Sequence, residues 1–201
     1  MKSPRALSIN GAVIVLLALA TFILLPGCSV NVKKDEGGQS KKVDIETPIG
    51  GIHVSKDAEA KDTGLPVYPG ARKKETEENG EEKSANVNIS TAAFGLKVVA
   101  IEYESDVAPE KIIAYYKDQL KKYGNVLVCH TRHHGGDVSA HAGKHGSEHT
   151  KDLKCEGDNS GDVIELKAGT EDNQHLVAIE PAGKGSTFAL VYVQTRGDET
   201  I

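Results

Sequence analysis

The stretch "ANVNISTAAFGLKVVAIEYES", Ala85–Ser105, decides the fold expected for this chain of 201 residues. Apolar and polar side chains alternate around Val87 and Ile89, and they alternate again beyond Ala93–Gly95. Alternation with a period of two is typical of a half-buried β-strand. The stretch therefore predicts two strands joined by a hinge near Ala93–Gly95.

The next stretch, "APEKIIAYYKDQLKKYG" (108–124), has the pattern of a helix. Pro109 suits the first helical turn and Gly124 suits the position just beyond the last one. Apolar side chains recur at steps of four, four and three, which places them on one side of a helix: Ile112, Tyr116, Leu120 and Tyr123. We therefore expect a helix with a single apolar stripe.

Further alternating or apolar segments follow the helix and predict four more strands: "NVLVC" (125–129), "GDVIELKAG" (161–169), "QHLVAIEP" (174–181) and "STFALVYVQTR" (186–196). The order of the predicted elements, with strands before and after a single helix, favours an α+β fold, because the helix can cover one face of an antiparallel sheet. We expect a sheet of about five to six strands with one long helix packed on a face.

The first residues have the features of a secretory signal. Lys2 and Arg5 precede an uncharged apolar run, Gly11–Leu25. This run is shorter than the roughly 20 residues that span a membrane, but its length fits the apolar part of a signal peptide. An uncleaved N-terminal anchor helix is the alternative interpretation.

The run ends in "LPGC", residues 25–28, which resembles the lipobox of bacterial lipoproteins. The resemblance implies that Cys28 is diacylated and becomes the first residue of the mature chain, so the membrane is a partner through the lipid anchor. Ser29 follows the cysteine, and in two-membrane bacteria serine there implies an outer-membrane location facing the periplasm. Removing residues 1–27 takes away two positive charges, which changes the formal net charge from −5 to −7.

A chain this acidic has no basic patch to neutralise phosphates, so nucleic-acid binding is excluded from the expected functions.

The alternation at "VDIETPIGGIHV" predicts an N-terminal hairpin or bent strand. We expect four parts: a signal peptide (1–27), a flexible tether (28–42), a hairpin with linkers (43–84) and an α+β domain (85–201).

The segments "GLPVYPGA" (64–71) and "YY" (115–116) carry a second resemblance. Residues 64–124 are similar to small uncharacterised domains of bacterial secreted proteins and lipoproteins, which have a YPGA turn and a tyrosine-bearing helix. The resemblance implies an α+β fold and brings no catalytic residues with it.

Cys129 and Cys155 are the other two cysteines, and 25 residues lie between them. In an oxidising compartment an even pair of cysteines indicates a disulfide. Free thiols and a zinc site that combines cysteine with histidine are the alternatives.

The segment between the two cysteines belongs to a histidine-rich loop, residues 130–154, which holds six of the chain's eight histidines: His130, His133, His134, His141, His145 and His149. The last three are four residues apart, as on one face of a helix, but Gly143 and Gly146 between them disfavour a helix. We expect a solvated loop without preorganised ligands. The alternative is capture of Zn²⁺, Cu²⁺ or Ni²⁺ by neutral imidazoles.

No arrangement of nucleophile and base or of paired carboxylates stands out, so we expect no enzyme activity and no cofactor. The expected function is that of a lipid-anchored cell-envelope protein, a binding or structural module with an envelope protein as its partner. The alternative is a periplasmic lipoprotein that binds divalent metal through the histidine-rich loop.

Overall fold

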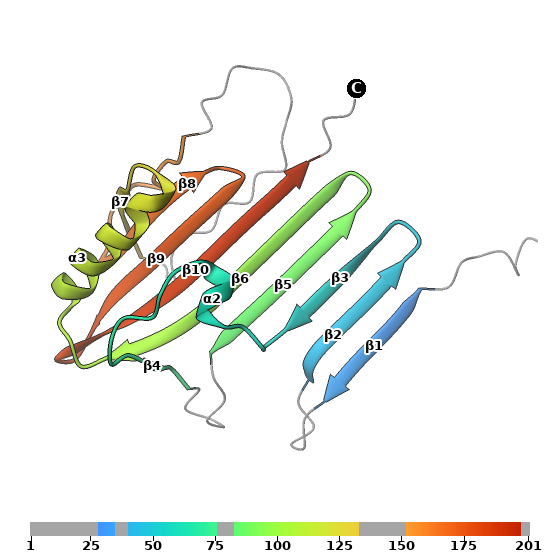
Figure 1. Ribbon diagram of the computed structural model, residues 1–201, viewed down its shortest axis with the longest axis horizontal. Helices are drawn as coiled ribbons and strands as arrows, with labels where there is room; N and C mark the ends of the chain where they lie inside the picture. Colours follow the sequence, from blue (N-terminus) through green and yellow to red (C-terminus); the bar gives the residue numbers. More distant parts are fainter. Residues whose placement is uncertain (1–27, 35–39, 76–82, 133–151, 198–201) are drawn as a thin grey trace, which may run out of the picture.

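The computed structural model describes residues 28–34, 40–75, 83–132 and 152–197. Within them, one antiparallel sheet holds ten strands, nine of them in the order β1-β2-β3-β5-β6-β10-β9-β8-β7, while β4 pairs with β6 (Figure 1). The strands are β1 (Ser29–Lys34), β2 (Ser40–Thr47), β3 (Gly50–Ser55), β4 (Arg72–Lys73), β5 (Ser84–Thr91), β6 (Phe94–Ser105), β7 (Leu127–Thr131), β8 (Val163–Thr170), β9 (Asn173–Ala182) and β10 (Gly185–Gly197).

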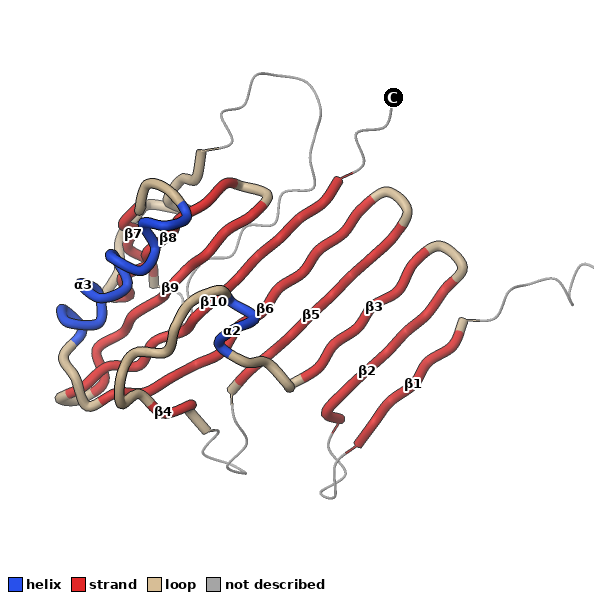
Figure 2. The backbone as a smooth tube through the Cα atoms, in the orientation of Figure 1, coloured by secondary structure: helices blue, strands red, loops and turns tan. Residues whose placement is uncertain are grey.

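The helices of the described residues are α2 (Ala60–Thr63), α3 (Pro109–Leu120) and a single 3₁₀ turn, η1 (Lys121–Tyr123). The helix predicted from the apolar stripe is present as α3, and Ile112, Tyr116 and Leu120 are fully buried. Both α-helices contact one half of the sheet: α3 packs on β8, β9 and β10, and α2 packs on β6 and β10 (Figure 2).

The expected fold class is wrong. The sheet has ten strands instead of five or six, and α3 has only 12 residues, about 18 Å, so it covers three strands and not a whole face. The fold is a large antiparallel sheet with two short helices, not an α+β layer pair. The difference arises mainly before residue 56, where β1, β2 and β3 extend the sheet.

Where a flexible tether was expected, over residues 28–42, the structure has the edge strand β1 and the start of β2. Val30 of β1 lies opposite Ile45 of β2, and Val32 lies opposite Val43. A six-residue polar segment with two valines carries too little pattern to predict a strand by itself. It becomes one because its valines meet the apolar side chains of the neighbouring strand.

The core on the helix side is built around Phe188, which is 1% exposed. Its ring stacks on Tyr103, with 5.5 Å between centroids, and contacts the Tyr116 ring of α3 at 5.6 Å. A second cluster lies on the opposite face of the sheet: Val163, Leu176, Ala178, Ala189, Val191 and Val193. On that face Glu165 and Lys167 form a buried ion pair, 3.1 Å from oxygen to nitrogen.

Tyrosines of α3 and η1 hold the "GLPVYPGA" segment. The Tyr116 hydroxyl donates to the Pro66 carbonyl at 3.1 Å and accepts from the Tyr68 backbone N–H at 3.0 Å. The Tyr123 hydroxyl donates to the Gly64 carbonyl at 2.5 Å. Gly64 has φ +73°, and a Cβ there would lie 2.5 Å from the Tyr123 hydroxyl, so both backbone and space require glycine.

His175 is stacked on Tyr123, with 3.5 Å between ring centroids, and its Nδ1–H donates to the Thr63 carbonyl at 2.8 Å. Burial, and then the positive charge of Lys122, lower the pKa of His175 below 6.5, while the bond to Thr63 opposes that shift. Well above pH 6.5 this imidazole is neutral in both the folded and the unfolded protein. As the pH falls below 6.5, the unfolded chain takes up the proton first, so folding loses stability.

We therefore expect the free energy of unfolding to fall more steeply between about pH 7 and about pH 5 in the wild type than in His175→Gln. Urea unfolding at each pH measures both slopes. The partly exposed imidazole of His53 offers the control, because His53→Gln leaves the buried His175 in place and should retain the effect of His175 on the slope. Equal slopes for wild type and His175→Gln would show that His175 is not the group responsible.

Candidate binding surface

Cys28 is exposed and immediately precedes β1. Ser29 pairs with Glu46 near the end of β2, and the next residues of that hairpin form the turn at Pro48–Ile49. Gly50 in turn pairs with Thr91, where β5 ends. Cys28 and the β2–β3 and β5–β6 turns therefore all lie at one end of the sheet (Figure 1).

Two rows of apolar side chains cross five strands on the face opposite the helices, in matching register. One row is Val30, Ile45, Ile52, Ile89 and Leu96, and the other is Val32, Val43, Val54, Val87 and Val98. The rows continue the apolar face on which the second cluster lies, since Leu96 and Val98 pack against that cluster. The sequence alternation thus produces one continuous apolar face from β1 to β10.

The outer part of this face is uncovered. We call Val30, Val32, Ile49, Ile52 and Val54 the apolar corner; they are 64, 43, 78, 38 and 37% exposed. They are five of the six large apolar side chains that are exposed among the described residues; the sixth is Val128. Exposed apolar patches are typical of surfaces that bind a partner or a membrane, so we take the apolar corner as the candidate binding surface.

The other face of β1–β3 is polar. His53 lies between two carboxylates, with Nδ1 2.9 Å from Asp44 and Nε2 3.2 Å from Glu46, and Lys42 is 3.4 Å from Asp44. The hydrogen bond from His53 is the main reason why the pKa of Asp44 is below its ordinary value. The corner of the sheet is therefore amphipathic, with water-facing charges on one side and valine and isoleucine on the other.

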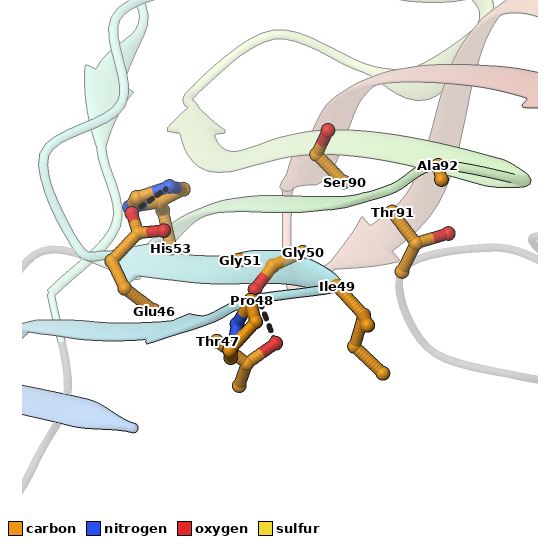
Figure 3. Close-up of a pocket in the computed structure, with 10 residues that line it drawn as sticks. All are labelled: Glu46, Thr47, Pro48, Ile49, Gly50, Gly51, His53, Ser90, Thr91 and Ala92. Atoms are coloured by element: carbon orange, nitrogen blue, oxygen red, sulfur yellow. Dashed lines mark hydrogen bonds and ion pairs between the residues drawn. The ribbon is translucent and has the colours of Figure 1, made fainter. Parts of the chain in front are cut away.

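A shallow, open hollow of about 390 Å³ lies at this end of the sheet, bordered by Glu46, His53, Ser90 and the β2–β3 turn. Figure 3 draws the residues that line it. The Glu46 and His53 side chains point toward each other, and Ile49 points away from them. In the parts of the chain that the structure describes, no group of three or more histidine, cysteine, aspartate or glutamate residues is arranged to hold a metal ion.

The predicted disulfide is confirmed: Cys129 on β7 is bonded to Cys155, with 5.4 Å between their Cα atoms. His130 is exposed, its backbone N–H donates to the Asn159 side chain at 2.7 Å, and its ring lies 3.3 Å from the Gly161 carbonyl. The other five residues of the predicted metal set lie outside the described residues: His133, His134, His141, His145 and His149. Metal binding by the loop therefore stays a prediction.

The alternation at residues 43–54 does not reveal that His53 has two acidic neighbours. Asp44, Glu46 and His53 alternate on the two arms of one hairpin, but only the register shows that they share a face. The apolar corner was missed for the same reason, because β1 was expected to be a tether.

No family model, no curated protein and no solved structure matches this chain. None of the helices in the described residues is long and apolar enough to cross a membrane.

Proposed function

We propose that this chain is a lipid-anchored protein of the bacterial cell envelope that acts as a binding or structural module. Diacylation of Cys28 would hold it on a membrane, and the outer membrane facing the periplasm is the proposed location. Its extended sheet would present binding surfaces there to an envelope protein. No catalytic step is part of the proposal.

The observation that carries the proposal is the position of the lipobox cysteine. Cys28 is exposed and stands one residue before the edge strand, at the end of the sheet where Ile49 is also exposed. A lipid on this sulfur would leave the folded sheet undisturbed. The disulfide between Cys129 and Cys155 supports an oxidising compartment, where such bonds persist.

Metabolic labelling with an alkyne-tagged fatty acid tests the anchor. We expect the wild type to be labelled and to sediment with membranes, and Cys28→Ser to lose the label, because it lacks the sulfur that would carry the lipid. The matched control is the double variant Cys129→Ala with Cys155→Ala, which removes the other two cysteines and should remain labelled. A wild type without label would overturn the proposed function.

A further inference from the structure

We propose that the apolar corner lies in the headgroup region of the membrane and forms a second contact beside the lipid on Cys28. This inference rests on the proposed function, because it takes the anchor at Cys28 as its starting point. It adds an orientation: the corner of the sheet at β1–β3 faces the lipid, and the helix-covered half points away from it.

The absence of a tether in the described structure brings the corner close to the anchor. Consecutive Cα atoms are about 3.8 Å apart, so Ser29 stays within one residue of the lipidated cysteine. Neighbouring strands are about 4.8 Å apart, which places the β2–β3 turn within roughly 10 Å of the start of β1. Amphipathic elements bury their apolar side about 5–10 Å into the interface, so the corner is within reach.

The two ends of the sheet differ in charge in the way a membrane contact requires. At the anchor end, the turns "TPIG" (47–50) and "TAAF" (91–94) contain no charged residue. At the opposite end, the connections beyond β3 and between β9 and β10 carry Lys56, Asp57 and Lys184. Charged groups are costly to bury in lipid, so the two uncharged turns are the part of the sheet that can enter the interface.

Charged residues at the anchor end restrict how the sheet tilts. Arg196 and the turn Glu171–Asp172 also lie at this end, but Arg196 is on β10 and the turn joins β8 to β9. These strands are at least five positions from β1, about 24 Å at the usual strand spacing. A sheet tilted onto the β1 corner keeps them in water, and the Glu46 and His53 side chains point to the polar face.

β2 and β3 suit contact with lipid because their backbone groups are paired on both sides, whereas the outer edge of β1 has backbone groups that need the hydrated headgroups. β2 lies between β1 and β3, and β3 lies between β2 and β5, so the interface would meet only side chains along them. On β1 the two lysines at the far end, Lys33 and Lys34, are the positions farthest from the anchor. The valines near the start of β1 are the ones that face lipid.

A second copy of the chain is a weaker candidate for the same surface. Three strands of about 20 Å, spaced about 4.8 Å apart, present a flat area of roughly 300 Å². Stable dimers bury about 800 Å² on each partner. The apolar corner alone therefore supplies too little area for a dimer, whereas a protein already held by lipid needs only a small additional contact.

Tryptophan fluorescence tests the inference directly, since the chain contains no tryptophan. The full-length lipoprotein carrying Ile49→Trp is purified from membranes and reconstituted in phosphatidylcholine vesicles, with and without brominated acyl chains. Ile49 is 78% exposed, so the substitution leaves the core intact. The matched control is Lys184→Trp, at an exposed turn on the opposite end of the sheet.

We expect the emission of Ile49→Trp to shift to the blue on reconstitution and to be quenched by the brominated lipids, and the emission of Lys184→Trp to do neither. A labelled, membrane-bound protein in which neither tryptophan is quenched would overturn the inference and leave the proposed function intact. Blue-shifted emission without lipid quenching, together with a dimer in sedimentation, would assign the corner to a second copy instead. A wild type that carries no fatty-acid label would overturn the proposed function, and this inference with it.

Discussion

Replacing Phe188 by alanine is expected to lower the free energy of unfolding by about 3–5 kcal/mol. Phe188 is 1% exposed and its ring contacts those of Tyr103 and Tyr116, so it joins the central strands to α3. Truncation removes apolar surface that is buried on folding and leaves a cavity among rings that cannot collapse far. Urea unfolding followed by circular dichroism measures the change.

The control for this experiment is Ile49→Ala, which also removes a large apolar side chain but from a site that is 78% exposed. Surface substitutions of this kind change stability by less than about 0.5 kcal/mol. If Phe188→Ala were no more destabilising than Ile49→Ala, the aromatic cluster would not be the centre of the core.

Removing the disulfide is expected to lower the free energy of unfolding by about 3.5 kcal/mol, the loop-entropy value for a separation of 26 residues. The double variant Cys129→Ala with Cys155→Ala removes the bond without leaving a free thiol. Cys129 is 1% exposed at its position on β7, so alanine also avoids placing a hydroxyl in a buried site. Unfolding of the variant and the wild type, each without reductant, gives the difference.

Reductant supplies the internal control, because it should destabilise the wild type and leave the double variant unchanged. The disulfide links β7, at one edge of the sheet, to the chain before β8. A loss smaller than about 1 kcal/mol would mean that the unfolded chain is already restricted in this region.

The sequence identified the individual elements well where a pattern was long. The β5–β6 hairpin, the α3 stripe and the strands β8, β9 and β10 were expected within a few residues of their observed positions. The pairing of Cys129 with Cys155 also followed from the sequence, because only two candidates remained once Cys28 was assigned to the lipid. These features depend on the local periodicity of side chains or on the number of cysteines, and both can be read from the sequence alone.

The size of the sheet and the candidate surface could not be obtained in the same way. β1 contains two valines in six residues, and Asp44, Glu46 and His53 are spread over two strands. Whether these residues share a face of the sheet depends on which residues lie opposite one another. This register is set by pairing between strands that are distant in the sequence. We expected linkers between the hairpin and the rest of the chain, and therefore did not predict that β3 pairs with β5.

By itself, the sequence determined which segments can be strands or helix, because alternation and the apolar stripe of α3 follow from side-chain spacing along each element. It also determined the lipobox resemblance and the oxidised cysteine pair. Only the tertiary structure decided that the N-terminal segments join one ten-stranded sheet and that Ile49 and Cys28 share an end. The physical reason is that hydrogen-bonded register, not local pattern, aligns the apolar rows of separate strands on a single face.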